Sequence, residues 1–311
     1  MTTTVAPRTT TSRSRTRPPS KAHTRSWVGF SFTAPAIVML LVFFFVPLIL
    51  CFLLAFTNAR LISGEPTRIT GLDNFQRLFS DPLFWKSLRN TAYFAVVVVP
   101  MQSALALLLA ILVNGQGRAK NFFRTLYFVP VVTSIVVVSI LWRFMYASDG
   151  LINSMLQLVT FNAVQGTDWL SNTSTAMPAV ILMSIWQAVG FHMVIWLAGL
   201  QTIPMDLYEA ASLDGAGRWD QFRFVTWPGL KNTRTFILVT ITIAALSLFA
   251  QVQVMTSGGP LDSTSTVVYQ AVRAGYTQQA TGYASAISLV FFALVLTVSL
   301  IQQFLTRDKD A

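Results

Sequence analysis

Charged residues and cysteine are both scarce in this chain of 311 residues. Only 11% of its residues are charged and 53% are hydrophobic, with 12 acids against 22 Lys and Arg. That balance lies outside the range of soluble globular proteins. The single cysteine, Cys51, excludes a disulfide framework and a cysteine metal cluster. Because Cys51 lies inside a long apolar run, we expect a buried structural thiol.

The sequence also lacks the common motifs of enzymes and nucleotide-binding proteins. It contains no GxxxxGK[ST] phosphate loop, no HExxH, no GxSxG and no paired Cys/His cluster. We therefore expect no catalytic residue, no bound cofactor and no metal site. His192 is alone in an apolar run without an acidic partner, which favours packing or pore lining over a proton relay. This lack of ionisable groups also argues against ion-coupled transport and for energy supplied from elsewhere.

Long apolar runs are what the chain has in abundance. A run of about 20 apolar residues can cross a bilayer core of roughly 30 Å. Six such runs occur, at residues 26–57, 92–113, 122–146, 177–200, 235–255 and 283–305. None contains an acid, and Arg124 and Arg143 near the ends of the third can extend to an interface. The sequence predicts an all-α integral membrane protein with six transmembrane helices in one domain, residues 26–305, because the connecting segments are too short for a soluble domain.

The distribution of basic residues predicts the orientation. Residues 1–25 hold six Lys and Arg and no acid, as in a disordered tail at an anionic cytoplasmic leaflet. A cleaved signal peptide is the competing interpretation, but the apolar run that follows is too long for one. With the N-terminus inside, 15 Lys and Arg lie on the cytoplasmic side and seven outside. Both termini, including residues 306–311, are predicted to be cytoplasmic, and membrane topology explains the basic charge better than nucleic-acid binding does.

The predicted outer loop, residues 58–91, has apolar residues at helical intervals. They are Phe75, Leu78, Phe79, Phe84, Trp85 and Leu88. This spacing predicts short amphipathic helices at the outer surface. They are either a lid over the spans or a surface that receives a partner.

A polar segment, residues 204–228, separates the fourth and fifth runs and carries four of the twelve acids. We expect a helix after Pro204, with Asp206 and Glu209 as a capping-box variant. A turn at Gly215 should follow, and then a short helix that Pro228 stops or kinks. On the predicted topology this segment lies in a cytoplasmic loop, residues 201–234.

The spacing within this segment resembles a known pattern. Glu209-Ala210-Ala211, then Gly215, then Val225 to Pro228 is similar to the EAA-x3-G-x9-I-x-L-P loop of permease subunits of binding-protein-dependent ABC importers. Val225 replaces the Ile of that pattern, and Trp227 replaces the Leu. GLDNF at 71–75, DPLFW at 81–85 and TSGGP at 256–260 look like carbohydrate-uptake permeases of the maltose and glycerol-3-phosphate type. The resemblance covers about residues 26–305.

The resemblance implies a coupling helix that docks on a cytoplasmic ATPase, although a purely structural loop could show the same helix, turn and helix. The implied ATPase-docking residues are Tyr208, Glu209, Ala210, Ala211, Asp214, Gly215 and Ala216. The implied partners are a second homologous permease, two ATPase subunits that use ATP and Mg²⁺, and an external solute-binding protein. The implied location is a bacterial cytoplasmic membrane.

A solute path through the spans would need polar or aromatic side chains, because sugars are bound by hydrogen bonds and ring stacking. In the fifth run Thr240, Ala244, Ser247 and Gln251 fall at spacings of four, three and four, as on one helical stripe. Helix packing is the alternative role for such residues. The candidates for the path are Trp186, Gln187, Thr240, Ser247 and Gln251.

The predicted function is a permease subunit that imports a sugar or sugar-like solute. The alternatives are the same machinery for glycerol phosphate or another small polar solute, a channel or secondary carrier, and a membrane scaffold or signalling protein.

Overall fold

The computed structural model describes residues 32–62, 66–115, 117–161 and 166–306. The predicted tail at residues 1–25, the start of the first span and residues 307–311 lie outside this range. The described chain is helical, and its one β-type contact is an isolated bridge between Thr57 and Ile69. Contacts divide the chain into two units, residues 1–50 and 51–311.

The described part of the first unit is a single apolar helix. It begins at Phe32, passes through the π-helix η1 (Leu41–Phe45) and continues as α2 (Val46–Leu54), which extends into the second unit. Its 23 residues have few polar side chains and are long enough to cross a membrane. Most of its apolar side chains are exposed.

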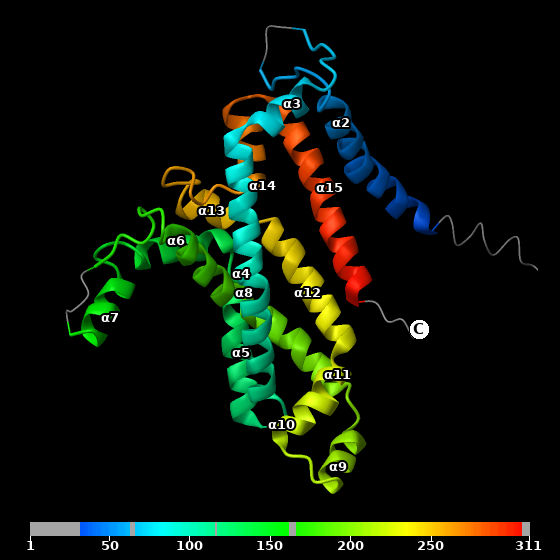
Figure 1. Ribbon diagram of the computed structural model, residues 1–311, viewed down its shortest axis with the longest axis vertical. Helices are drawn as coiled ribbons and strands as arrows, with labels where there is room; N and C mark the ends of the chain where they lie inside the picture. Colours follow the sequence, from blue (N-terminus) through cyan, green and yellow to red (C-terminus); the bar gives the residue numbers. More distant parts are fainter. Residues whose placement is uncertain (1–31, 63–65, 116, 162–165, 307–311) are drawn as a thin grey trace, which may run out of the picture. The chain divides into compact units, whose positions relative to one another are not determined.

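Two long helices lie side by side in the core of the second unit, α4 (Pro82–Val113) and α8 (Ala176–Gln201) (Figure 1). They pack together with α5 (Arg118–Val132) and α12 (Lys231–Leu246). The remaining elements are α3 (Asp73–Ser80), α6 (Ile135–Met145), α7 (Leu151–Val159), α9 (Met205–Leu213), α10 (Arg218–Gln221), η2 (Phe222–Thr226), α11 (Trp227–Gly229), α13 (Ala250–Met255), α14 (Val267–Val272), η3 (Arg273–Thr277) and α15 (Thr281–Thr306).

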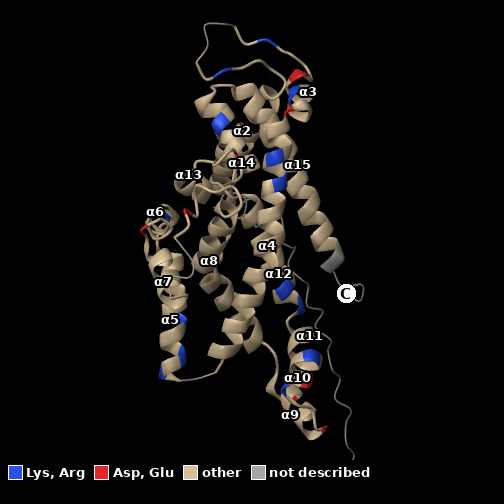
Figure 2. Cartoon of the chain, turned by 60° about the vertical axis from the view of Figure 1, so that its left-hand side comes forward, with Lys and Arg blue, Asp and Glu red and all other residues tan. Residues whose placement is uncertain are grey.

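The described helices include five that are long and apolar enough to cross a membrane, or six if the bent pair of α5 and α6 forms one span. Long stretches of these helices carry no charged residue (Figure 2). The expectation that residues 122–146 form one continuous helix is wrong, because α5 and α6 meet at an angle of 96°. Pro130 lies inside α5 just before this bend, where its ring removes a backbone donor and weakens the helix.

Close backbone contact with α5 fixes one side of α8. A Cβ atom on Gly190 would lie 1.9 Å from the carbonyl oxygen of Tyr127, so only glycine fits there. On another side of α8, His192 is buried, with Nδ1 2.8 Å from Nε2 of Gln102 on α4 and 3.0 Å from the carbonyl of Ala188. Of the two roles expected from its isolation, packing and pore lining, the burial of His192 favours packing.

The helix α4 begins ten residues earlier than the apolar run from which the span was predicted. Asp81 starts it by accepting a hydrogen bond from the backbone N–H of Leu83, at 2.9 Å, and Pro82 occupies the first turn. This extension was not predicted, because the polar residues Lys86, Arg89 and Asn90 interrupt the apolar pattern. The short helices expected in residues 58–91 are present as α3 and the first turns of α4, with Leu78 and Phe84 buried.

The carboxylate of Asp81 also joins three helices. Its Oδ2 accepts hydrogen bonds from the Tyr283 hydroxyl of α15, at 2.6 Å, and from Nε2 of Gln270 in α14, at 3.1 Å. The guanidinium of Arg77 lies 4.1 Å from the centre of the Tyr283 ring, a cation–π contact. We call the group formed by Asp81, Gln270 and Tyr283 the Asp81 cluster.

Candidate functional site

The segment 204–228 folds as two short helices around a glycine turn. Gly215 has φ of +83°, as expected for a residue that ends a helix in the left-handed region. The N–H of Ala216 bonds to the carbonyl of Ala211 at 2.9 Å, and the N–H of Gly215 bonds to the carbonyl of Ser212 at 3.1 Å. These two bonds close the last turn of α9 and turn the chain toward α10.

The start of α9 differs in one respect from the sequence prediction. The helix begins after Pro204 as expected, but no side chain caps it, so the capping-box variant of Asp206 and Glu209 is wrong. Pro204 occupies the N-cap position itself and has no hydroxyl or carboxylate to offer. Asp206 remains in the first turn, where its charge complements the helix dipole.

Side-chain bonds tie α9 to the helix that follows. The Tyr208 hydroxyl lies 3.0 Å from the Thr226 hydroxyl, and Nε2 of Gln221 donates to the Ser212 hydroxyl at 2.9 Å. The rings of Trp219 and Phe222 stack, with centroids 5.6 Å apart. Because Tyr208, Phe222 and Val225 pack against the buried core, these contacts hold the two short helices in a defined orientation.

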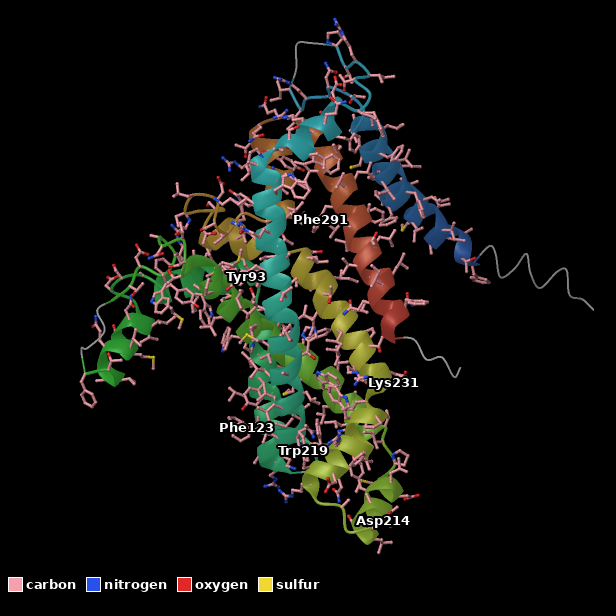
Figure 3. The ribbon with its side chains drawn as sticks, in the orientation of Figure 1. Tyr93, Phe123, Asp214, Trp219, Lys231 and Phe291 are labelled. Carbon is pink, nitrogen blue, oxygen red and sulfur yellow. The ribbon has the colours of Figure 1, made fainter. Side chains whose placement is uncertain are left out.

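The outward surface of this segment has no partner in the described chain. No residue of α9 is buried, and Asp214 lies at the tip of the segment in Figure 3. Of the predicted docking residues, Glu209, Ala210, Asp214 and Gly215 are exposed, and Tyr208, Ala211 and Ala216 are half-buried. Leu213 is 89% exposed and Trp219 is 70% exposed. Exposed apolar and acidic side chains on a fixed support are typical of a protein-docking surface.

Two predicted path residues lie on α8 near its contact with α5 and α6. Trp186 is 45% exposed, and its ring centroid lies 5.4 Å from that of Trp142 on α6. Gln187 is half-buried, with Nε2 3.5 Å from the carbonyl of Pro130 at the α5–α6 bend. The amide of Gln187 thus lies beside a bent and polar stretch of backbone.

The stripe predicted in the fifth run does not continue as one helical face. Helix α12 ends at Leu246, with Ser247 as its C-cap, and α13 begins only at Ala250. Phe249, with φ of −140° and ψ of −59°, departs from helical geometry. Ser247 is exposed, whereas Gln251 belongs to α13 and no longer follows the register of Thr240. The hydroxyl of Thr240 bonds to carbonyls of its own helix, at 2.9 and 3.0 Å.

Comparisons with known proteins identify the family. Residues 102–310 match the model of the "Binding-protein-dependent transport system inner membrane component". The chain belongs to this family. It is 34% identical to the lactose transport system permease protein LacF of Rhizobium radiobacter, over 90% of this chain and 94% of that protein. It is 32% identical to the arabinooligosaccharides transport system permease protein AraP of Bacillus subtilis, over 88% of this chain and 86% of that protein.

The fold agrees with a solved transporter. A chain of a bacterial alginate ABC transporter, solved with an alginate pentasaccharide-bound periplasmic protein, superposes with a TM-score of 0.80. The match covers 92% of this chain and 96% of that chain at 24% identity, and it shows the shared fold. The protein is thus an all-helical, multi-pass ABC importer permease.

Sequence reasoning missed a polar cavity of this permease. Three cavities of about 690, 480 and 530 Å³ occur among the described residues, and none is lined by a predicted path residue. The cavity of about 480 Å³ lies between the end of α6, residues 168–171 and the end of α13. No sequence signal connects these three segments, because they come together only in the tertiary fold.

Proposed function

We propose that this permease imports a sugar and that segment 204–228 receives the energy for it from separate ATPase subunits. The names of LacF and AraP support the solute class, since those proteins are described as lactose and arabinooligosaccharide permeases. The diacetylchitobiose uptake permease NgcF of Streptomyces coelicolor, 35% identical over 74% of this chain, also supports it. ATP and Mg²⁺ belong to the partner subunits in this proposal, and this chain binds no cofactor.

The observation that carries the coupling role is the exposure of α9 on a fixed support. Glu209 and Asp214 supply charge to a partner surface, and Ala210 and Ala211 permit close approach. Gly215 sets the turn, and Tyr208 fixes α9 to η2 through its bond to Thr226. A rigid connection of this kind can transmit movement from a docked ATPase to the bundle, because Phe222 and Val225 pack against the buried core.

The same proposal assigns the remaining partners and the orientation. A second homologous permease completes the pathway, an external binding protein delivers the solute, and segment 204–228 faces the cytoplasm together with both termini. Trp186, Gln187, Thr240, Ser247 and Gln251 stay candidates for the path. Of these, Trp186 and Gln187 have the best support, because an exposed ring and a half-buried amide lie together on α8.

Charge reversal at Glu209 tests the coupling role. Glu209→Lys and Gly215→Val should abolish sugar uptake in cells while the permease remains inserted in the membrane at its normal amount. The matched control is Asp73→Lys, which reverses an exposed acid on α3, outside segment 204–228. Normal uptake in both segment variants would refute the coupling role, and uptake that continues without ATP would favour a channel or secondary carrier.

A further inference from the structure

The cavity between α6 and α13 has a mixed set of polar groups. Its lining residues include Arg143, Asp168 and the hydroxyl residues Ser148, Ser171 and Thr256. Its volume of about 480 Å³ lies in the range of small-molecule sites. Its lining comes from residues 143–148, 168–171 and 255–260, so the cavity is a product of the tertiary fold.

The two charged side chains of this cavity are not paired with each other. Arg143 and Asp168 form no ion pair with each other or with any other residue in the described ranges, in contrast to Arg273, whose Nη1 lies 3.1 Å from Oδ1 of Asp262. An anion in the cavity would face Asp168, and a cation would face Arg143. A neutral molecule with several hydroxyl groups could donate to the carboxylate and accept from the guanidinium.

A row of packed aromatic rings lies between this cavity and Trp186 on α8. Tyr146 lines the cavity, and its ring centroid lies 5.4 Å from that of Trp142. Trp142 in turn lies 5.4 Å from Trp186 on α8. Trp169 approaches Tyr146 from the other side, at 6.2 Å. Because Tyr146 and Trp142 are buried, these rings support the wall of the cavity, and its polar lining residues are what a sugar would meet.

We propose that this cavity is an entry subsite for a neutral sugar. The proposal rests on the sugar-import function proposed above. It adds where the sugar first binds and which side chains recognise it. Arg143 and Asp168 bind the sugar hydroxyls, and the order in which different sugars are accepted depends on these two residues.

Cysteine modification tests whether the cavity lies on the sugar's route. In a Cys51→Ser background, Ser148→Cys places a thiol in the cavity, and Ser174→Cys places one on an exposed serine of the same connection outside it. The probe is a negatively charged thiosulfonate added outside. The sugar is whichever of lactose, diacetylchitobiose and an arabinooligosaccharide the cells take up.

Modification of Ser148→Cys should remove about nine-tenths of the uptake, and excess sugar should slow the modification, whereas modified Ser174→Cys should keep normal uptake. Unchanged uptake after complete modification of Ser148→Cys would overturn the subsite. If no sugar is taken up by the unmodified protein, the sugar-import proposal fails instead, so the two failures are distinguishable.

A second measurement separates sugar recognition from docking of the binding protein. Asp168→Asn and Arg143→Gln should each change the ratio of uptake rates between two sugars about fivefold, with the same binding protein present. Arg89→Gln, a change at an exposed arginine of another cavity, should leave the ratio unchanged. An equal loss for all sugars would mean that the residues serve protein docking, and it would overturn the proposal.

Discussion

Polar side chains at the beginning of α4 have hydrogen-bond partners in the chain, whereas two acids of segment 204–228 have none among the described residues. Around α4, Asp81 has three hydrogen-bond donors, and Nδ2 of Asn90 donates to the carbonyls of Asp262 and Ser265 at 3.0 and 2.9 Å. In segment 204–228, Glu209 and Asp214 are exposed and make no side-chain bond to another described residue. The first region takes its hydrogen-bond partners from within the chain, although Oε1 of Gln270 has none, and the second leaves both acids exposed, as the proposed docking requires.

This difference predicts that the two regions respond differently to substitution. Changes in the Asp81 cluster should lower stability, since a buried donor that loses its partner costs about 1–3 kcal/mol. Changes at exposed positions of α9 should leave stability within about 0.5 kcal/mol and affect only assembly and uptake.

The largest effect is expected for Asp81→Ala. This change removes the cap of α4 and leaves Tyr283 and Gln270 without their acceptor, so we expect a loss of about 3 kcal/mol. Thermal unfolding of the purified permease in detergent would measure it, with Asp73→Ala as the control. A melting temperature equal to that of the control would mean that the Asp81 cluster does not hold the three helices together.

A smaller loss is expected for Gly190→Ala. The added methyl would lie 1.9 Å from the carbonyl oxygen of Tyr127, so α5 and α8 must separate at a cost of about 2 kcal/mol. Gly217→Ala is the matched control, because its Cβ would meet no atom closer than 3.6 Å. If the two variants unfold at the same temperature, the close contact between α5 and α8 is not rigid.

The smallest effect on stability is expected for Gly215→Ala, which separates an effect on uptake from an effect on stability. Alanine at φ of +83° is strained by about 1 kcal/mol, although its Cβ meets no atom within 4 Å. The uptake rate should fall by more than this loss of stability explains, because the strain changes the end of α9 at the proposed docking surface. Gly215→Asn should recover much of the uptake, since asparagine tolerates this conformation. Equal uptake in the alanine and wild-type proteins would show that the turn is not critical.

Sequence reasoning predicted local features better than long-range ones. The apolar runs, the helix after Pro204 and the positive φ of Gly215 follow from local composition, and the structure agrees with them. The early start of α4 was missed, because its polar first turns are satisfied by a loop more than 170 residues away.

The breaks in the third and fifth runs were missed for a related reason. Hydropathy records whether a side chain is apolar and carries no information on the direction of the helix axis. The 96° bend between α5 and α6 and the interruption at Phe249 therefore left no periodic signal. The cavity with Arg143 and Asp168 joins three separate segments and was likewise not predicted from hydropathy.

Cross-linking from α9 tests the central claim most directly, that segment 204–228 docks on the ATPase. In a Cys51→Ser background, a thiol-to-amine cross-linker would be attached at Ala210→Cys on α9 or at Ser80→Cys on α3, both exposed positions. We predict an ATP-dependent cross-link to an ATPase subunit from Ala210→Cys and none from Ser80→Cys. A cross-link to the ATPase from Ser80→Cys and none from Ala210→Cys would contradict the claim.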